Sequence, residues 1–295
     1  MNEHEALVER VSSSAETVML IGGLDSGKST LARALLGAAL AAGRRSAYLD
    51  ADLGQKCVGP PGTIGLRMLA SADDLGPDRL FAADGLAFVG ATSPQGHLLP
   101  VVTGTATLLQ RARSEGAELV VVDTSGFVSG IYGQLLKYHK VEMVRPDVVV
   151  GLQRGEELAP LLGVIQRFFP SEVDALGVHP DVRPSSVEQR AESRKLSMRA
   201  YFSGELHRWR VKPTVFMPAL PPLFDLGQLD RLLVGLSDGK GTYLGIGFLE
   251  YGSDEVLRLV SPVADGPKAL RLGSVRLEEN FRAKRVDLRN LFGTE

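Results

Sequence analysis

Strand-like and helix-like segments alternate along the first part of the chain. Short runs that favour buried strands lie at residues 17–21, 45–49, 86–90, 118–122 and 147–152. Segments with helical spacing or helix-favouring composition lie at residues 3–15, 31–42, 105–114, 157–169 and 186–202. Apart from its strand, the stretch 56–99 is predicted to be rich in loops. The alternation is typical of a mainly parallel sheet flanked by helices, so we predict an α/β fold.

The pattern changes from about residue 212. A cluster of prolines interrupts the helical spacing, and short strand-like runs follow at 243–251, 256–260 and 270–275, separated by Gly and Asp turns. A chain of 295 residues can hold one large domain and a small one. We therefore predict an α/β domain at 1–212 and a small, mostly-β C-terminal domain at 213–295.

The segment between the first strand and the helix at 31–42 is rich in glycine and carries a phosphate-binding motif. Residues 22–29 read Gly-Gly-Leu-Asp-Ser-Gly-Lys-Ser and fit G-x-x-x-x-G-K-[ST]. Glycine lets backbone N–H groups surround an anion, Lys28 would contact the β- and γ-phosphates, and the Ser29 hydroxyl would ligate Mg²⁺. The residues expected to bind the nucleotide are Gly23, Asp25, Ser26, Gly27, Lys28, Ser29 and Thr30. The fold predicted for this part is that of a P-loop NTPase.

Two carboxylates follow the strand at 45–49. Asp50 and Asp52 leave the strand at its carboxyl end, where ligands gather in open α/β sheets. One carboxylate could orient Mg²⁺ or its waters, while the other accepts a proton from an acceptor hydroxyl. The alternative is a solvated turn, since Asp and Gly are turn formers. The neighbouring phosphate loop favours the functional interpretation.

The strand at 118–122 also ends in a carboxylate, within Asp123-Thr124-Ser125-Gly126. In P-loop enzymes an aspartate at this place lies near Mg²⁺. The same four residues spell D-x-x-G, as in GTPase switch regions, so they do not separate a kinase from a GTPase. A GTPase would carry Asn/Thr-Lys-x-Asp after the strand at 147–152, and that motif is missing from the sequence.

The helix at 186–202 carries several arginines. Arg190 and Arg194 are four residues apart and so share one face. The planar guanidinium fits phosphate oxygens and can neutralise charge on a transferring phosphoryl group. Alternatively, these arginines pair with Glu188 and Glu192 on a solvated surface. The spacing alone leaves both interpretations open.

Composition and charge narrow the function classes further. The net charge is −2 and the isoelectric point about 6.3, so any nucleic-acid site must be local. A single cysteine, Cys57, excludes an internal disulfide and a zinc site built from several cysteines. The sequence shows neither a signal peptide nor a membrane span, so we expect a cytoplasmic protein without a membrane partner. It identifies no protein partner.

Several separated segments together resemble the polynucleotide 5′-hydroxyl kinase family, the kinases associated with pre-mRNA cleavage factor and with tRNA and ribosomal RNA processing. The resemblance runs from about residue 17 to residue 204. The matching segments are the phosphate loop, Asp50–Gln55 as D-x-D-x-G-Q, Pro60–Thr63, Thr92–Pro94, Asp123–Val128 and the arginine segment from Arg190 to Gly204. The D-x-D-x-G-Q segment together with the arginine segment is far more specific than the phosphate loop.

The resemblance implies transfer of the ATP γ-phosphate, with Mg²⁺, to the 5′-OH end of RNA or DNA. Asp52 would be the general base and Asp50 its partner on the Mg²⁺ side, although the order could be reversed. The implied catalytic residues are Lys28, Asp52, Arg190 and Arg194. The implied metal ligands are Ser29, Asp50 and Asp123. The residues expected at the acceptor strand are Gln55, Thr124, Ser125, Gly126 and Phe127.

Two features depart from the family pattern. Phe127 stands where the family usually has tryptophan, and it can stack on a base but lacks the indole donor. Larger members carry an N-terminal β-domain that helps to hold the base, whereas here the phosphate loop begins at Gly22, so we expect a compact, prokaryotic-like form. Two alternatives to the kinase are a nucleotide-switched module that binds RNA or protein with little transfer, and a P-loop GTPase.

Overall fold

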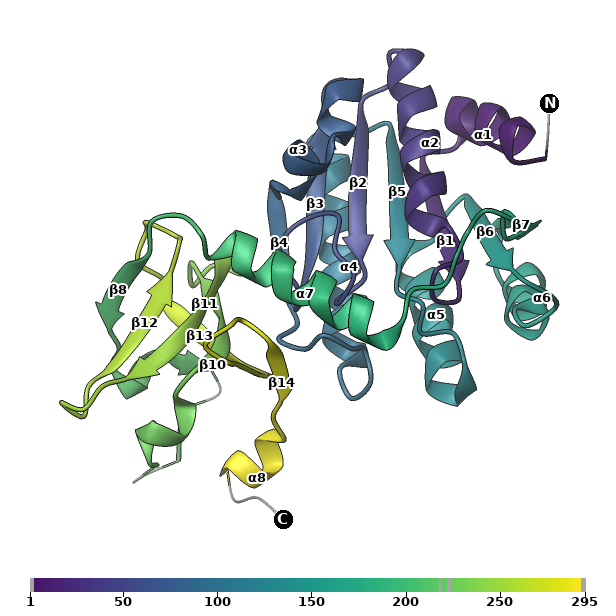
Figure 1. Cartoon of the computed structure of the whole chain (residues 1–295). Helices are drawn as coiled ribbons and strands as arrows, with labels where there is room; N and C mark the ends of the chain where they lie inside the picture. The colour runs from purple at the N-terminus through teal and green to yellow at the C-terminus, as the bar shows by residue number, and fades with distance from the viewer. Residues whose placement is uncertain (1–2, 218, 222–223, 293–295) are drawn as a thin grey trace.

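One continuous sheet organises the molecule. The computed structural model describes residues 3–217, 219–221 and 224–292, and within these it forms a sheet of 14 strands. The main order is β14-β13-β10-β11-β4-β3-β2-β5-β1-β6-β7, with β12, β8 and β9 paired to this path. Figure 1 shows the N-terminal strands and their helices at one end of the molecule and the C-terminal strands at the other.

The N-terminal end of the sheet is mainly parallel. Its strands are β1 (Thr17–Gly22), β2 (Ser46–Ala51), β3 (Thr63–Leu69), β4 (Gly85–Phe88), β5 (Leu119–Thr124), β6 (Val148–Gln153) and β7 (Glu172–Gly177). Strands β2, β5, β1, β6 and β7 run parallel, whereas β3 pairs antiparallel with both β2 and β4. The predicted α/β fold with a mainly parallel sheet is confirmed.

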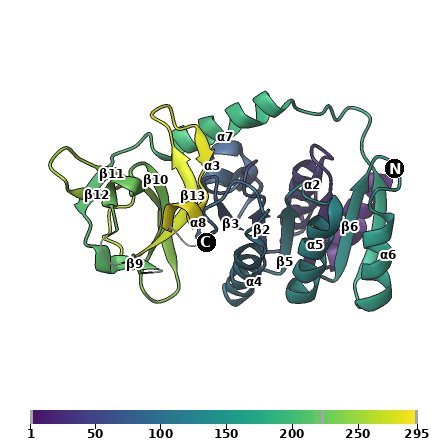
Figure 2. The ribbon, with the colours of Figure 1, turned by 90° about the horizontal axis from the view of Figure 1, so that it is seen from below.

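Helices cover both faces of this sheet, as Figure 2 shows with α2 on one side and α4, α5 and α6 on the other. The helical segments of this part are α1 (Glu3–Ser14), α2 (Lys28–Ala41), the short 3₁₀ helix η1 (Ala72–Leu75), α3 (Pro77–Phe81), α4 (Leu98–Ser114), α5 (Gly130–Val144), α6 (Ala159–Phe168) and α7 (Val187–Tyr201). Alternate residues of β1 enter opposite cores, Val18 and Leu20 on the α2 side, Met19 and Ile21 on the other. Both faces are buried, so a register slip of one residue would misplace every side chain.

The pattern missed some elements of this half. The stretch 56–99, predicted to be rich in loops, contains strand β3. The sequence does not indicate this strand, because Gly65 and Arg67 interrupt its apolar run. Helix α5 and strand β7 were not predicted either. The helix predicted at 105–114 begins earlier, at Leu98.

The C-terminal part is mostly β, as the sequence predicts. It contains β8 (His207–Arg210), η2 (Pro213–Val215), β9 (Phe216–Met217), η3 (Leu226–Leu229), β10 (Leu232–Ser237), β11 (Tyr243–Tyr251), β12 (Leu257–Ser261), β13 (Ala269–Leu277), β14 (Ala283–Arg285) and α8 (Leu288–Phe292). Strand β8 pairs with β12, so pairing with this part begins before residue 212. The two parts meet where Tyr243 of β11 pairs with Leu86 of β4.

Helix α7 connects the two parts and crosses the molecule in front of the ends of β2 and β5 (Figure 1). Ser186 caps its N-terminus by accepting a hydrogen bond from the backbone N–H of Gln189, whose side chain bonds back to Ser186 N–H. At the other end, Met198 and Phe202 are buried against strands of the C-terminal part. The arginine-bearing helix therefore lies over the sheet edge that carries the predicted site.

Gly65 allows β3 to approach the segment that follows β2, and its replacement by alanine tests that approach. An added Cβ would lie 2.3 Å from the carbonyl oxygen of Val58, so backbone must shift, and we expect Gly65→Ala to lower the free energy of unfolding by about 1–3 kcal/mol. Gly163 is an exposed helical glycine with open space around it, and Gly163→Ala is expected to raise stability by up to about 1 kcal/mol. Denaturant unfolding of both variants measures the contrast. Equal effects would contradict it.

Candidate functional site

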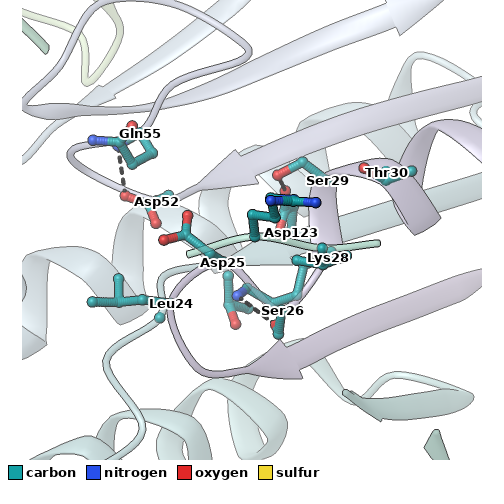
Figure 3. Close-up of a pocket in the computed structure, with 14 residues that line it drawn as sticks. Leu24, Asp25, Ser26, Lys28, Ser29, Thr30, Asp52, Gln55 and Asp123 are labelled. Carbon is teal, nitrogen blue, oxygen red and sulfur yellow. Dashed lines mark hydrogen bonds between the residues drawn. The ribbon is translucent and has the colours of Figure 1, made fainter. Parts of the chain in front are cut away.

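A polar cavity of about 240 Å³ lies beyond the carboxyl ends of β1, β2 and β5 (Figure 3). Four segments line it: the phosphate loop, the turn after β2, the end of β5 and the connection from β7 to α7. Register explains the convergence, because Asp50 of β2 and Leu20 of β1 both pair with Asp123 of β5. The lining residues are Leu24–Thr30, Asp52, Gln55, Asp123, Thr124, Gly126, Val182 and Arg183.

The phosphate loop is shaped by glycine and by close backbone approach. Gly27 has a φ of 89° at the N-terminal cap of α2, a conformation that L side chains rarely adopt. At Gly126 an added Cβ would lie 2.7 Å from the backbone nitrogen of Leu24, so only glycine lets the end of β5 pack against the loop. The N–H groups of the first turn of α2 thus point toward the cavity, which suits an anion.

Lys28 is buried in the cavity wall. Its Nζ donates to the carbonyl oxygens of Gly22 and Gly23, at 3.0 and 2.7 Å, and to Ser26 Oγ at 3.2 Å. Burial lowers the pKa of Lys28, and the carboxylate of Asp123 opposes that shift. A phosphate group would replace backbone oxygens with a charged partner for this ammonium group.

Asp123 has one bonded oxygen and one orphaned oxygen. Its Oδ2 accepts hydrogen bonds from Ser29 Oγ at 2.6 Å and from Tyr48 Oη at 2.8 Å. Its Oδ1 is buried and has no hydrogen-bond partner within the described part of the chain. Buried polar atoms are nearly always satisfied, so this oxygen calls for a ligand outside the protein chain, such as an ion or its water.

Asp52 presents a carboxylate oxygen to the cavity. Its Oδ1 accepts from the backbone N–H groups of Gly54 and Gln55, at 2.8 and 3.0 Å, which fixes the side chain. Among the described residues no hydrogen bond reaches Oδ2. Gln55 in turn donates from Nε2 to the carbonyl oxygen of Arg190 at 3.1 Å, so the turn after β2 contacts α7.

Asp50 faces away from this cavity, although the sequence gives it equal weight with Asp52. Its carboxylate accepts from the backbone N–H groups of Asp52, Cys57 and Val58. Lys56 Nζ lies 3.1 Å from its Oδ2, with both side chains buried. Burial raises the pKa of Asp50 to about 6, while Lys56 opposes the shift. These contacts suit a residue that shapes the turn after β2 rather than a metal ligand.

Two buried lysines of α5 lie behind the site, and sequence analysis missed both. Lys137 Nζ donates to Thr124 Oγ1 at 2.8 Å and to the carbonyl oxygen of Ser125 at 2.6 Å, which holds the end of β5. Lys140 Nζ is buried without a hydrogen-bond partner among the described residues. The sequence signal was present, because both lysines lie on the apolar stripe of Leu136 and Val141.

Two arginines of α7 lie against the segments that line the cavity, Arg190 at the phosphate loop and Arg194 at the turn after β2. Arg190 Nη1 lies 3.2 Å from Asp25 Oδ2 and also donates to the carbonyl oxygen of Ser185. Asp25 Oδ2 further accepts from the backbone N–H of Ser185. Arg194 is half-buried over the turn after β2, and burial together with the charge of Arg190 lowers its pKa. The helix is therefore tied to the phosphate loop through an Asp–Arg pair.

The structure brings most of the expected residues together, but not all. Those that line the cavity are Asp25, Ser26, Gly27, Lys28, Ser29, Thr30, Asp52, Gln55, Asp123, Thr124 and Gly126. Those placed outside its lining are Gly23, Asp50, Ser125, Phe127, Arg190 and Arg194. Phe127 is half-buried against the core on the α5 side of the sheet. Arg183, which was not predicted, lines the cavity, and Arg154 donates to the carbonyl oxygens of Leu24 and Asp25.

Two further properties of the described residues concern membrane-spanning helices and clusters of metal-binding side chains. None of their helices is long and apolar enough to cross a membrane. Nor do they contain a group of three or more His, Cys, Asp or Glu side chains that could hold a metal ion by themselves. A divalent ion at Asp123 would therefore need ligands from a bound nucleotide and water.

Residues 22–204 match the family described as mRNA cleavage and polyadenylation factor CLP1 P-loop. A polyribonucleotide 5′-hydroxyl-kinase of Thermococcus kodakarensis is 31% identical over 321 residues, which cover 89% of this chain and 88% of that protein. Clp1 of Rattus norvegicus, also named a polyribonucleotide 5′-hydroxyl-kinase, is 30% identical over 69% of this chain and 50% of its own. In a solved Clp1p–Pcf11p complex, one chain shares this fold with a TM-score of 0.70 at 15% identity, over 92% of this chain and 77% of that one.

Lys140 offers a test of the buried charge behind the site. Burial lowers its pKa to about 7 from 10.5. Between these values the unfolded chain binds more protons than the folded chain, so wild-type stability rises with pH. Lys140→Met is therefore expected to stabilise the protein by more at about pH 6.5 than at about pH 9.5. Thermal unfolding at both pH values measures the difference, and a gain that does not shrink at the higher pH would contradict it.

Proposed function

The chain belongs to the CLP1 P-loop family, and from this premise we propose that it is a kinase that transfers the γ-phosphate of ATP to the 5′-hydroxyl end of RNA. One observation carries the proposal: Asp52 places in the cavity of the phosphate loop a carboxylate oxygen that has no hydrogen-bond partner within the described part of the chain. A kinase needs one to receive the proton of the acceptor.

The proposed reaction is a direct, in-line displacement. The 5′-oxygen of the acceptor attacks the γ-phosphorus, its proton passes to Asp52 Oδ2, and the bond from the γ-phosphorus to the bridging oxygen breaks to release ADP. Lys28 exchanges its backbone partners for the β- and γ-phosphates. Arg190 and Arg194 close over the transferring group and neutralise its charge, for which Arg190 must release Asp25.

The residues around Asp123 fit a magnesium ion. Ser29 Oγ and the orphaned Asp123 Oδ1 supply oxygen atoms, and Mg²⁺ usually takes one or two carboxylates together with phosphates and water. When bound, the ion would neutralise charge on the phosphate oxygens. Asp50 is left out of this proposed set because its own turn satisfies its carboxylate.

A second cavity, of about 300 Å³, provides a place for the base of the nucleotide. It shares Ser26, Gly27, Thr30 and Val182 with the phosphate cavity, and Val8 of α1 and Leu31 of α2 make its lining largely apolar. One ligand can thus occupy both cavities, with its triphosphate in the first and its base in the second. In this proposal α1 covers the base, the role that an added N-terminal domain has in larger relatives.

Substitution of Asp52 separates proton transfer from nucleotide binding. Asp52→Asn keeps the size of the side chain but removes its capacity to accept a proton, so we expect the rate of label transfer from γ-labelled ATP to 5′-OH RNA to fall by about 100- to 10,000-fold. The affinity for ATP is expected to change little. Lys28→Ala is the matched contrast and is expected to lose both transfer and ATP affinity.

The same assay tests the proposed function as a whole. RNA that already carries a 5′-phosphate is the negative control and is expected to take up no label. Bound ATP without label on any 5′-OH acceptor would overturn the kinase and favour a nucleotide-switched binding module. Retained transfer in Asp52→Asn would leave the kinase standing but remove Asp52 as its base.

The arginines of α7 are tested through Arg194. Arg194→Ala is expected to lower kcat by about 1,000-fold, because an arginine that stabilises the transferring phosphoryl group has an effect of that order. Stability is expected to stay close to that of the wild type, since the side chain has no ion pair among the described residues. Arg167→Ala, at an exposed position of α6, serves as the control. Similar kcat values for the two variants would rule out a catalytic role for Arg194.

A further inference from the structure

A chain of contacts leads from Asp52 to the C-terminal strands. The turn after β2 packs against the segment 91–97, because an added Cβ on Gly54 would lie 3.1 Å from the carbonyl oxygen of Thr92. At the other end of that segment, His97 Nε2 lies 3.0 Å from Ser274 Oγ of β13. The buried Ser274 also donates from its backbone N–H and from Oγ to the carbonyl oxygen of Gly90. The segment 91–97 therefore bridges the cavity of Asp52 and the C-terminal sheet.

Two adjoining cavities follow this segment. The smaller one is lined by Thr92, Ser93 and Gln95, and by Ser274 and Arg285 of the C-terminal strands. The larger one, of about 630 Å³, shares Ser274 and Arg285 and extends to Arg289. We call these two cavities together the 92–289 groove. It begins at the residue that touches the turn of Asp52 and ends on the segment after β14.

The lining of the 92–289 groove contains two arginines, Arg285 and Arg289, and their positive charge exceeds the negative charge of the lining. The guanidinium groups of Arg285 and Arg289 have neither an ion pair nor a hydrogen bond among the described residues. Among the described residues, Asp287 is the one carboxylate that lines the two cavities of this groove, and its Oδ1 accepts from the backbone N–H of Arg289. Burial and the nearby Arg285 and Arg271 lower the pKa of His97, consistent with a positive local field. In a chain of net charge −2, two arginines and one aspartate give the lining of this groove a net positive charge.

We propose that the 92–289 groove binds the sugar–phosphate backbone of the acceptor RNA downstream of its 5′ end, with Arg285 and Arg289 contacting phosphates. The proposal rests on the proposed function and extends it from the terminal nucleotide to the strand that follows. Hydroxyl and amide side chains at Ser93 and Gln95 suit sugar and phosphate oxygens. Contacts of this kind are independent of base sequence.

Geometry sets the length of acceptor that is needed. The five peptide units from Thr92 to His97 span at most about 18 Å. At about 3.4 Å per stacked nucleotide, roughly five nucleotides cover that distance. A 12-mer is therefore long enough to pass through both cavities. A 5′-OH dinucleotide carries a single internucleotide phosphate and can contact at most one of the two arginines at a time.

The test is the length dependence of RNA binding. Fluorescence anisotropy is measured with 5′-OH oligoribonucleotides of two and twelve nucleotides, for the wild type and the double variant Arg285→Ala/Arg289→Ala. We expect the wild type to prefer the 12-mer and the double variant to lose about ten-fold in affinity for it, so that the length preference disappears. The slope of log affinity against log salt for the 12-mer is expected to fall by about 0.7 per lost phosphate contact.

Two further variants sharpen the result. Arg285→Lys/Arg289→Lys keeps both charges and is expected to retain most of the length preference. Arg208→Ala removes an exposed arginine from β8, which pairs with β12 away from β14, and is expected to bind both lengths like the wild type. An unchanged length preference in the Ala/Ala variant, or an equal loss for both lengths, would overturn the proposal. RNA binding is measured without phosphoryl transfer. A failure of the kinase assay would therefore refute the proposed function, whereas only the binding data would refute the proposed role of the 92–289 groove.

Discussion

The parallel register of β1, β5 and β2 determines where the charged groups of the site lie. Leu20, Asp123 and Asp50 are paired across the three strands, so the phosphate loop, the Asp123 carboxylate and the turn of Asp52 all leave the sheet at one level. Apolar side chains on both faces hold that register, because a shift by one residue would bury the wrong side of every strand. The positions of Asp52, the proposed general base, and of the phosphate loop thus follow from core packing.

Buried charges then refine what the register places. Asp50 accepts hydrogen bonds from three backbone N–H groups and pairs with Lys56. These contacts shape the turn so that Asp52 faces the cavity. Lys137 does the equivalent for the end of β5 by holding Thr124 and the Ser125 carbonyl. Buried ionic groups of this kind cost desolvation energy and are poor sources of stability. Here they fix two short backbone segments whose geometry the site requires.

The sequence predicted those parts of the molecule whose signal is local. The strand at 17–21, the phosphate loop and the helix with Arg190 all have unbroken patterns, and the structure places them within a few residues of the predicted bounds. Strand β3 escaped because its apolar run contains Gly65, and α5 because its lysines look like surface residues. The pair Asp50 and Asp52 shows a different limit. The sequence alone does not distinguish the two carboxylates, and only the path of the chain after β2 determines that Asp52 faces the cavity.

Helix α7 is fastened at both ends, and this has a mechanical consequence. At its C-terminal end, Tyr201 Oη accepts from the backbone N–H of Ile246 in β11, and Met198 is fully enclosed. At its N-terminal end the attachments are the Asp25–Arg190 pair, which competing phosphate oxygens can replace, and the hydrogen bond from Gln55 Nε2 to the carbonyl oxygen of Arg190. The helix is about 22 Å long, so a rotation of roughly 5° about the Tyr201 end displaces its far end by about 2 Å. In the proposed kinase the C-terminal sheet would thus hold the end about which the helix turns, and the Arg190 end would move toward a bound nucleotide.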